Sequence, residues 1–303
     1  MSFAAQVKAE LCRAEPARCC QLAECLGIAL YCNTCSAAEL RIITENRDFA
    51  RRLPDLFRRC LGVTFDQLPG QDTAGKLSLV LSEPSKLHIL FDSFGFDPDR
   101  AVSLHLNRGL VEDDCCRAAF LRGAFLAGGS VTDPDKRYHL ELVTSHRAVS
   151  REVFSLLLDM DLSPKETERS GSSVIYFKQS NLIEDLLTTM GAPVSAMHIM
   201  ETKLEKDLRN SVNRRVNCET ANLTKVVDAA QEQVGAIERL MASTLWPDLP
   251  DKLKQTAQLR CGNPEATLQE LAELSEPPVS KSAINHRLRK LLSLAETHSQ
   301  EKR

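Results

Sequence analysis

The sequence predicts an α+β protein made of two related lobes, a helical linker and an all-α C-terminal domain. Three observations carry this prediction. One apolar stretch occurs twice, at 19–33 and at 115–129. β-rich runs follow both copies at matching positions, and residues 249–303 carry helical patterns only. In each lobe we expect the order helix, strand, (strand), helix, strand, helix, and we expect the lobes to be related by a pseudo-two-fold axis.

The repeated stretch predicts the contact between the lobes. A Cys-Cys pair, an Ala and a Gly recur at one offset of 96 residues, so that Gly27 corresponds to Gly123. Both copies are apolar and long enough for a helix. A glycine in the middle of a helix lets a second backbone approach closely, because it has no Cβ. We therefore predict a lobe interface at Gly27 and Gly123.

The elements after each copy also repeat. Residues 40–44 and 140–144 alternate and are β-rich, which is typical of strands. Helical stretches open at Arg47 and Arg147, and strands at 79–81 and 175–177 then precede amphipathic helices. Turn-rich breaks at 69–75 and 170–173 separate helix from strand. The predicted domains are 1–104 (first lobe with an N-terminal helix), 105–195 (second lobe), 196–248 (helical linker) and 249–303 (helix-turn-helix domain).

The linker has a strongly helical composition with one unusual span. Residues 210–223 contain four Asn, which are costly in a helix interior because their side chains compete for backbone hydrogen bonds. We expect turns or polar contacts in this span. Trp246-Pro247-Asp248-Leu249-Pro250 then breaks the helical pattern.

The C-terminal pattern is typical of a helix-turn-helix, with its segment from Thr267 to Leu294. A helix from Asp251 ends before Gly262-Asn263-Pro264, and Thr267 with Glu270 has the capping-box spacing for a short second helix. Pro277-Pro278 ends that helix, and Ser280 caps a longer basic helix. Its buried stripe is predicted to be Ile284, Leu288, Leu291 and Leu292. A short helix, a tight connection and a longer basic helix favour DNA binding.

The last helix carries the predicted DNA contacts. Residues 281–290 contain four Lys or Arg and no acid, although the whole chain has a net charge of −3. Phosphate contacts are predicted for Lys281, Arg287 and Lys290, and base-edge contacts for Ser282, Asn285, His286 and Arg289. The alternative is a helical interaction domain with a solvated charged face. Arg41 and Lys178, on predicted strands, are candidates for additional DNA contact by the lobes.

Composition limits the class of protein. Hydrophobic residues make up 43% and charged residues 26%, which is ordinary for a globular protein. Neither a signal peptide nor a run of about 18–20 apolar residues occurs, so we expect a cytoplasmic protein without membrane contact. The 11 cysteines are expected to be reduced thiols. A four-thiolate metal site made by Cys32-x-x-Cys35 and the Cys19-Cys20 pair is an alternative.

The repeated stretches resemble the signature helices of LAGLIDADG homing endonucleases, most clearly at 121–129. In that family the two helices form the lobe interface, and acids near the end of each motif bind the catalytic metal. The resemblance implies the same arrangement of helices here. This chain has Gly128 and Cys32 at those positions and Leu126 at the other acidic position. The resemblance therefore implies αββαββα-type lobes that keep the scaffold and lack the nuclease site, with no catalytic residue and no metal.

The double lobe joined to a helix-turn-helix resembles the WhiA family over nearly the whole chain. The most specific segments are 122–130, 210–222, Leu259-Arg260 with 263–265, and 280–282 with 285–288. The resemblance implies a non-enzymatic DNA-binding protein acting in transcription regulation, sporulation, cell division or chromosome segregation, associated with the nucleoid. Expected partners are double-stranded DNA and a sigma factor or partner regulator, with no cofactor and no small-molecule substrate. The alternatives are a protein-interaction scaffold and a metal-dependent DNA endonuclease.

Overall fold

The computed structural model describes residues 2–70, 75–97 and 104–301. The chain divides into two compact units, Met1–Asp207 (the first unit) and Leu208–Arg303 (the second unit). Both predicted lobes lie in the first unit, and the predicted helix-turn-helix segment lies in the second. Within the described residues, no helix combines the length and the apolar character needed to cross a membrane.

The first lobe begins with a short helix and then follows the predicted order. Part of the predicted break at 69–75 lies outside the described residues. In chain order the elements are α1 (Phe3–Leu11), α2 (Arg18–Tyr31), β1 (Thr34–Ser36), β2 (Glu39–Thr44), α3 (Arg47–Leu61), β3 (Leu77–Leu81) and α4 (Pro84–Ser93).

Counting described residues only, the second lobe repeats this order with one more full strand. Its elements are η1 (Arg108–Val111), α5 (Asp114–Gly128), β4 (Gly129–Val131), β5 (Leu140–Thr144), α6 (Arg147–Asp159), β6 (Lys165–Arg169), β7 (Ser172–Phe177) and α7 (Ser180–Met190). The α+β class and the duplicated αββαββα-type architecture are confirmed.

Both sheets are antiparallel, and equivalent strands in the two sheets pair in the same register. Their strand orders are β1-β2-β3 and β4-β5-β7-β6. Leu40 pairs with Leu81 in the first sheet, and Leu140 pairs with Phe177 in the second. In the part of the first lobe that the structure describes, a bridge between Gln67 and Val80 takes the place of the β6–β7 ladder. The alternation of residues along β2 and β5 buries one face of each sheet and leaves the other open.

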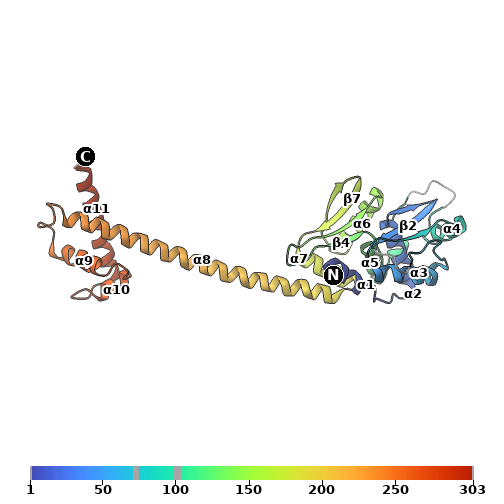
Figure 1. The fold of residues 1–303 in the computed structure, drawn as a ribbon, viewed down its shortest axis with the longest axis horizontal. Helices are drawn as coiled ribbons and strands as arrows, with labels where there is room; N and C mark the ends of the chain where they lie inside the picture. Colours follow the sequence, from blue (N-terminus) through green and yellow to red (C-terminus); the bar gives the residue numbers. More distant parts are fainter. Residues whose placement is uncertain (1, 71–74, 98–103, 302–303) are drawn as a thin grey trace. The chain divides into compact units, whose positions relative to one another are not determined.

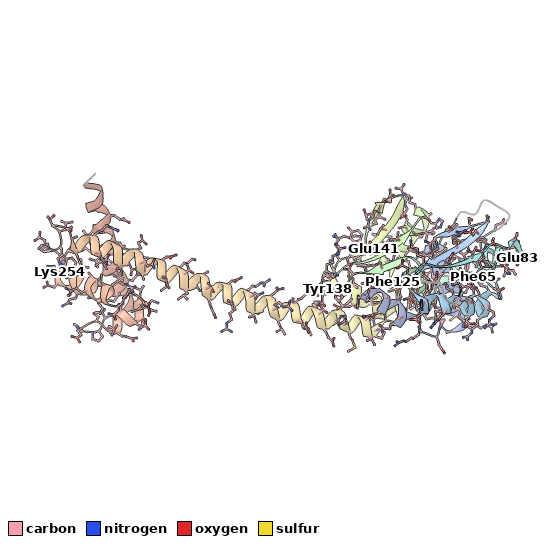
Figure 2. The ribbon with its side chains drawn as sticks, viewed as in Figure 1. Phe65, Glu83, Phe125, Tyr138, Glu141 and Lys254 are labelled. Atoms are coloured by element: carbon pink, nitrogen blue, oxygen red, sulfur yellow. The ribbon has the colours of Figure 1, made fainter. Side chains whose placement is uncertain are left out.

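The repeated helices α2 and α5 form the centre of the first unit, where Figure 1 shows them beneath the two sheets. A Cβ on Gly27 would lie 2.1 Å from the Phe120 carbonyl oxygen, and one on Gly123 would lie 2.2 Å from that of Glu24. Only glycine fits at this crossing. Aromatic and aliphatic side chains from both helices fill the core around it, among them Phe125, which Figure 2 labels.

A buried ion pair lies at the same crossing. Glu24 on α2 is completely buried and accepts hydrogen bonds from Arg122 on α5, with Nη2 to Oε2 at 2.9 Å. Arg52 on α3 donates to the other oxygen, also with Nη2 at 2.9 Å. Arg122 further donates to the carbonyl of Met190 at 3.1 Å. The three charged side chains therefore connect helices of both lobes.

The helix α8 (Pro193–Met241) runs from the first unit into the second without a break. The expectation of turns in the Asn-rich span 210–223 was wrong. Its four Asn lie in the helix and are exposed, so their side chains meet water and compete little with the backbone. Exposed apolar side chains also follow α8 at helical spacing, namely Leu208, Val212, Val216 and Leu223.

The second unit is completed by three helices that follow α8. They are α9 (Asp251–Gly262), α10 (Leu268–Glu273) and α11 (Lys281–Glu301). One hydrophobic cluster joins them to the last turns of α8. It contains Ala236, Ile237, Leu240, Leu253, Ala257, Leu271, Ala272, Ile284, Leu288, Leu291 and Ala295.

Candidate nucleic-acid interface

The short helix α10 begins at the predicted capping box. The Thr267 hydroxyl accepts a hydrogen bond from the Glu270 backbone N–H at 3.2 Å. The Glu270 carboxylate accepts one from the Thr267 N–H at 2.7 Å, which lowers the pKa of Glu270. These reciprocal bonds satisfy two backbone donors that a helix start leaves free. They fix the first residue of α10, and this position in turn sets where the connection to α11 starts.

A buried arginine fixes the connection between α9 and α10. Arg260 is 2% exposed and donates to the Ala266 carbonyl at 2.7 Å and to the Gln233 side chain of α8 at 2.9 Å. Burial lowers the pKa of Arg260. Because Arg260 is buried and its Nε and Nη1 are hydrogen-bonded within the protein, this arginine has a structural role. The role gives a physical reason for the Leu259-Arg260 motif that the sequence highlighted.

The basic helix α11 places most of the predicted DNA-contacting residues on its surface. Ser280 caps its start by accepting from the Ala283 N–H at 3.2 Å. Ile284, Leu288 and Leu291 are buried, and Leu292 is partly buried, so the opposite face is free. The exposed members of the predicted set are Lys281, Ser282, His286, Arg289 and Lys290.

Two members of the predicted set lie at the edge of that face. Asn285 is half-buried. Arg287 is also half-buried, and its Nη1 donates to the Thr256 hydroxyl of α9 at 3.4 Å. A long, single hydrogen bond of this kind leaves most donors of Arg287 available. Its assignment to a phosphate stays a prediction.

The open faces of the sheets carry paired charges. Arg41 forms an ion pair with Glu39 on the same strand. Lys178 was predicted on a strand but follows the end of β7, and its ammonium lies over the Tyr176 ring, 5.2 Å from the centroid. Glu141, labelled in Figure 2, lies within 3.2 Å of His139 and 3.5 Å of Arg169. Acidic side chains therefore lie among the basic ones here, which opposes binding of a phosphate backbone.

The positions equivalent to the nuclease acids are closed in both lobes. A Cβ on Gly128 would lie 2.4 Å from the Val143 carbonyl oxygen and 2.8 Å from that of Tyr31. The thiol of Cys32 is buried, and its Sγ lies 3.2 Å from the Ala29 carbonyl oxygen and 3.1 Å from that of Thr34, either of which can accept its single hydrogen. Neither position offers a carboxylate, and Gly128 has no room for one. A magnesium-binding pair of acids is therefore missing at this place.

One group of potential ligands was not predicted as a set. The thiols of Cys19, Cys20, Cys115 and Cys116, here called the four-cysteine cluster, all lie within 4.8 Å of one another. The sequence suggested a different grouping, with Cys32 and Cys35. The usable signal was the recurrence of the Cys-Cys pair at the offset of 96 residues, because a pseudo-two-fold axis brings equivalent positions together.

Two family models match the chain. The model described as the WhiA LAGLIDADG-like domain matches residues 117–209, and the model described as the WhiA C-terminal HTH domain matches residues 212–295. The second match ends inside α11 and covers every DNA-contacting residue predicted on that helix. The first covers the second lobe and the start of α8.

Similar proteins extend over the full chain. "Probable cell division protein WhiA" from Alkaliphilus oremlandii is 38% identical to this chain, and the alignment covers 97% of both proteins. The protein of the same name from Heliobacterium modesticaldum is 37% identical over 99% of this chain and 98% of its own. The crystal structure of full-length WhiA from Thermatoga maritima matches with a TM-score of 0.61 at 22% identity, covering 98% of this chain and 99% of that one. It supports the fold described above.

Proposed function

The chain belongs to the WhiA family, and from this premise we propose that it is a non-enzymatic DNA-binding regulator acting in bacterial cell division. The observation that carries the proposal is the free basic face of α11. This helix follows a capped short helix, as the recognition helix of a helix-turn-helix does. Proteins with the name "Probable cell division protein WhiA" provide the cellular process.

The charges on α11 suit a nucleic acid. Lys281, Arg289 and Lys290 are exposed, and residues 281–290 contain no acid that would neutralise them. Among the described residues, no ion pair involves any of the three. Their positive charge is therefore available to displace counterions from a phosphate backbone. Arg289 also offers a guanidinium that fits the edge of guanine.

The lobes support a regulator more than a nuclease. Gly128 and Cys32 replace the metal-binding acids, and the space around Gly128 excludes a larger side chain. We propose that the lobes contribute no cleavage activity. Incubating the full chain with plasmid and Mg²⁺ tests this, because any nicking of the plasmid would contradict the proposal. If a substitution at Gly128 left such nicking unchanged, the nuclease site would lie elsewhere in the chain.

A protein-interaction scaffold is the second candidate, and α8 favours it. Leu208, Val212, Val216 and Leu223 expose about half or more of their side chains on this helix. Exposed apolar rows of this kind often mark a contact with another protein. Under this alternative, a variant without a functional α11 would keep its partner and its cellular role.

DNA binding is tested by fluorescence anisotropy on genomic DNA fragments over a salt series. The fragment 208–303 is compared with the full chain. A fragment beginning at 249 is less suitable because it lacks Ala236, Ile237 and Leu240, which belong to the same core as α11. Tight, salt-dependent binding by 208–303 supports the proposal. Binding only by the full chain would place the DNA contact in the lobes.

The finer roles are part of the same proposal. We propose that the protein regulates transcription, associates with the nucleoid in the cytoplasm, and works with a sigma factor or partner regulator. Roles in sporulation and in chromosome segregation rest on the family resemblance. Sequencing the DNA that is crosslinked to the protein in cells tests these roles together, because a regulator enriches promoters, whereas a segregation factor does not need to.

A further inference from the structure

The four-cysteine cluster has the dimensions of a tetrahedral metal site. The Cys19 and Cys20 sulfurs are 3.7 Å apart, and those of Cys115 and Cys116 are 4.0 Å apart. All four sulfurs lie within 4.8 Å of one another. A Zn²⁺ ion bound at about 2.3 Å from each sulfur requires sulfur–sulfur distances of about 3.8 Å. The observed distances therefore need only small side-chain adjustments to hold one ion.

The two Cys pairs occupy equivalent positions in the two lobes. Each pair forms the second and third residues of a helix, α2 in the first lobe and α5 in the second. The backbone N–H groups of a first helical turn are not all used within the helix, and the helix dipole is positive there. Both features favour negative charge at a helix start. Burial raises the pKa of the Cys20 and Cys116 thiols, so these two lose their protons only as a metal ion binds. Two helix starts thus converge on one set of sulfurs.

The burial of the cluster fits a structural site with an entry path. Cys20 and Cys116 are buried, while Cys19 and Cys115 are exposed. The buried pair supplies ligands with restricted motion, and the exposed pair gives a metal ion access. Within the described residues, no second group of three or more metal-binding side chains is present.

We propose that the four-cysteine cluster binds one Zn²⁺ ion as a structural site that joins the two lobes. Zn²⁺ suits four thiolates because it imposes no other geometry and undergoes no redox change. Binding replaces four thiol protons by the ion, so that one Zn²⁺ enters and four protons leave. The ion would join α2 to α5 at their N-terminal turns, about two helical turns before the glycine crossing. This proposal is independent of DNA binding by α11.

The direct test uses the reduced full chain after metal removal. Titration with Co²⁺, a spectroscopic substitute for Zn²⁺, should saturate at one ion per chain. It should produce thiolate-to-cobalt charge-transfer absorption and the visible bands of a tetrahedral site, and Zn²⁺ should then remove both signals. Saturation without these bands, or metal that a weak chelator removes, would mean adventitious binding only and would overturn the proposal.

Two double variants locate the site. The variant Cys115→Ser/Cys116→Ser should lose the cobalt bands completely. The matched control Cys32→Ser/Cys35→Ser removes as many thiols, including a CxxC pair, and should keep them. If the control loses the bands and the first variant keeps them, the CxxC grouping is the site and the proposal is wrong.

A measurement on the unmodified chain covers the case in which a variant does not fold. Alkylation followed by mass spectrometry should find the four-cysteine cluster protected with Zn²⁺ and reactive after chelation. The exposed Cys218 on α8 should react in both states. Protection that a reductant removes and a chelator does not would reveal disulfides, and it would exclude the metal site.

Discussion

Arg122 in the first unit and Arg289 in the second serve opposite purposes. In the first unit, Arg122 is 7% exposed and gives its donors to Glu24 and to the Met190 carbonyl. In the second, Arg289 is exposed on α11, and no ion pair with it occurs among the described residues. Both residues lie in segments that resemble nucleic-acid-binding families. The comparison teaches that burial and pairing, not ancestry of the fold, decide which arginine is available to DNA.

The difference continues on the surfaces. The open sheet faces of the first unit combine Arg41 with Glu39 and Arg169 with Glu141. On α11 the basic side chains are not accompanied by acids over residues 281–290. Substitutions in the first unit should therefore change folding stability, and substitutions on α11 should change DNA binding. Four predictions test this division, in order of decreasing effect.

The largest effect is expected from Glu24→Ala. It leaves the buried Arg122 and the half-buried Arg52 without their carboxylate, and the loss of one partner of a buried ion pair typically costs about 3–5 kcal/mol. Urea denaturation should show the first unit unfolding earlier while the second unit keeps its own transition. A loss below about 1 kcal/mol would mean that water satisfies Arg52 and Arg122, and the contrast with Arg289 would then weaken.

Gly123→Ala should destabilise the first unit by about 1–3 kcal/mol, because the added Cβ overlaps the Glu24 carbonyl oxygen. The second unit offers a matched control. Gly262 lies at the end of α9 with nothing within 4 Å of an added Cβ, so that Gly262→Ala should change stability by less than about 1 kcal/mol. Thermal unfolding of both variants measures the difference. Equal shifts would show that the α2–α5 crossing can widen.

Arg289→Ala should weaken binding to a specific DNA site by about 1–3 kcal/mol and leave folding stability within about 0.5 kcal/mol. Arg41→Ala, which removes an arginine already paired with Glu39, serves as the control and should leave binding unchanged. Anisotropy titrations with specific and scrambled DNA measure both. If Arg41→Ala lost more DNA affinity than Arg289→Ala, the sheets and not α11 would make the main DNA contact.

The smallest effect is expected from Lys290→Ala. A lysine that meets a phosphate should weaken binding to all sequences alike and reduce the slope of log K against log salt by about one. Titrations at several salt concentrations measure this slope. If Lys290→Ala instead changes the preference between specific and scrambled DNA, the assignment of phosphate and base contacts on α11 must be exchanged.

Local patterns in the sequence were sufficient for the elements and for the duplication. Leu40 and Leu140 begin equivalent strand segments, and Thr267 with Glu270 forms the predicted capping box. These features depend on neighbours along the chain. Even the glycine crossing could be predicted, since two copies of an apolar helix with a central glycine are expected to pack closely against each other.

The features that the sequence did not predict depend on contacts between distant residues or on exposure to solvent. Glu24 and Arg122 are 98 residues apart, and neither has a local feature that predicts burial. The four-cysteine cluster requires the two Cys pairs to be placed across the pseudo-two-fold axis. The continuity of α8 was missed because Asn propensity was weighed without the knowledge that these side chains meet water. The contact of Arg287 with Thr256 likewise needs the packing of α9.

The buried ion pair also determines which lobe pairs with which. At the offset of 96 residues, the counterparts of Glu24 and Arg122 are Phe120 and Leu26, both fully buried. The pseudo-symmetry is therefore broken by charge at one place. In a pair of two first lobes, Glu24 of each lobe would face Leu26 of the other, and in a pair of two second lobes, Arg122 would face Phe120. Either pairing would leave buried charges opposite apolar side chains, at an electrostatic cost. The duplicated chain thus encodes the pairing of unlike lobes, and it disfavours contact between two first lobes or two second lobes of neighbouring copies.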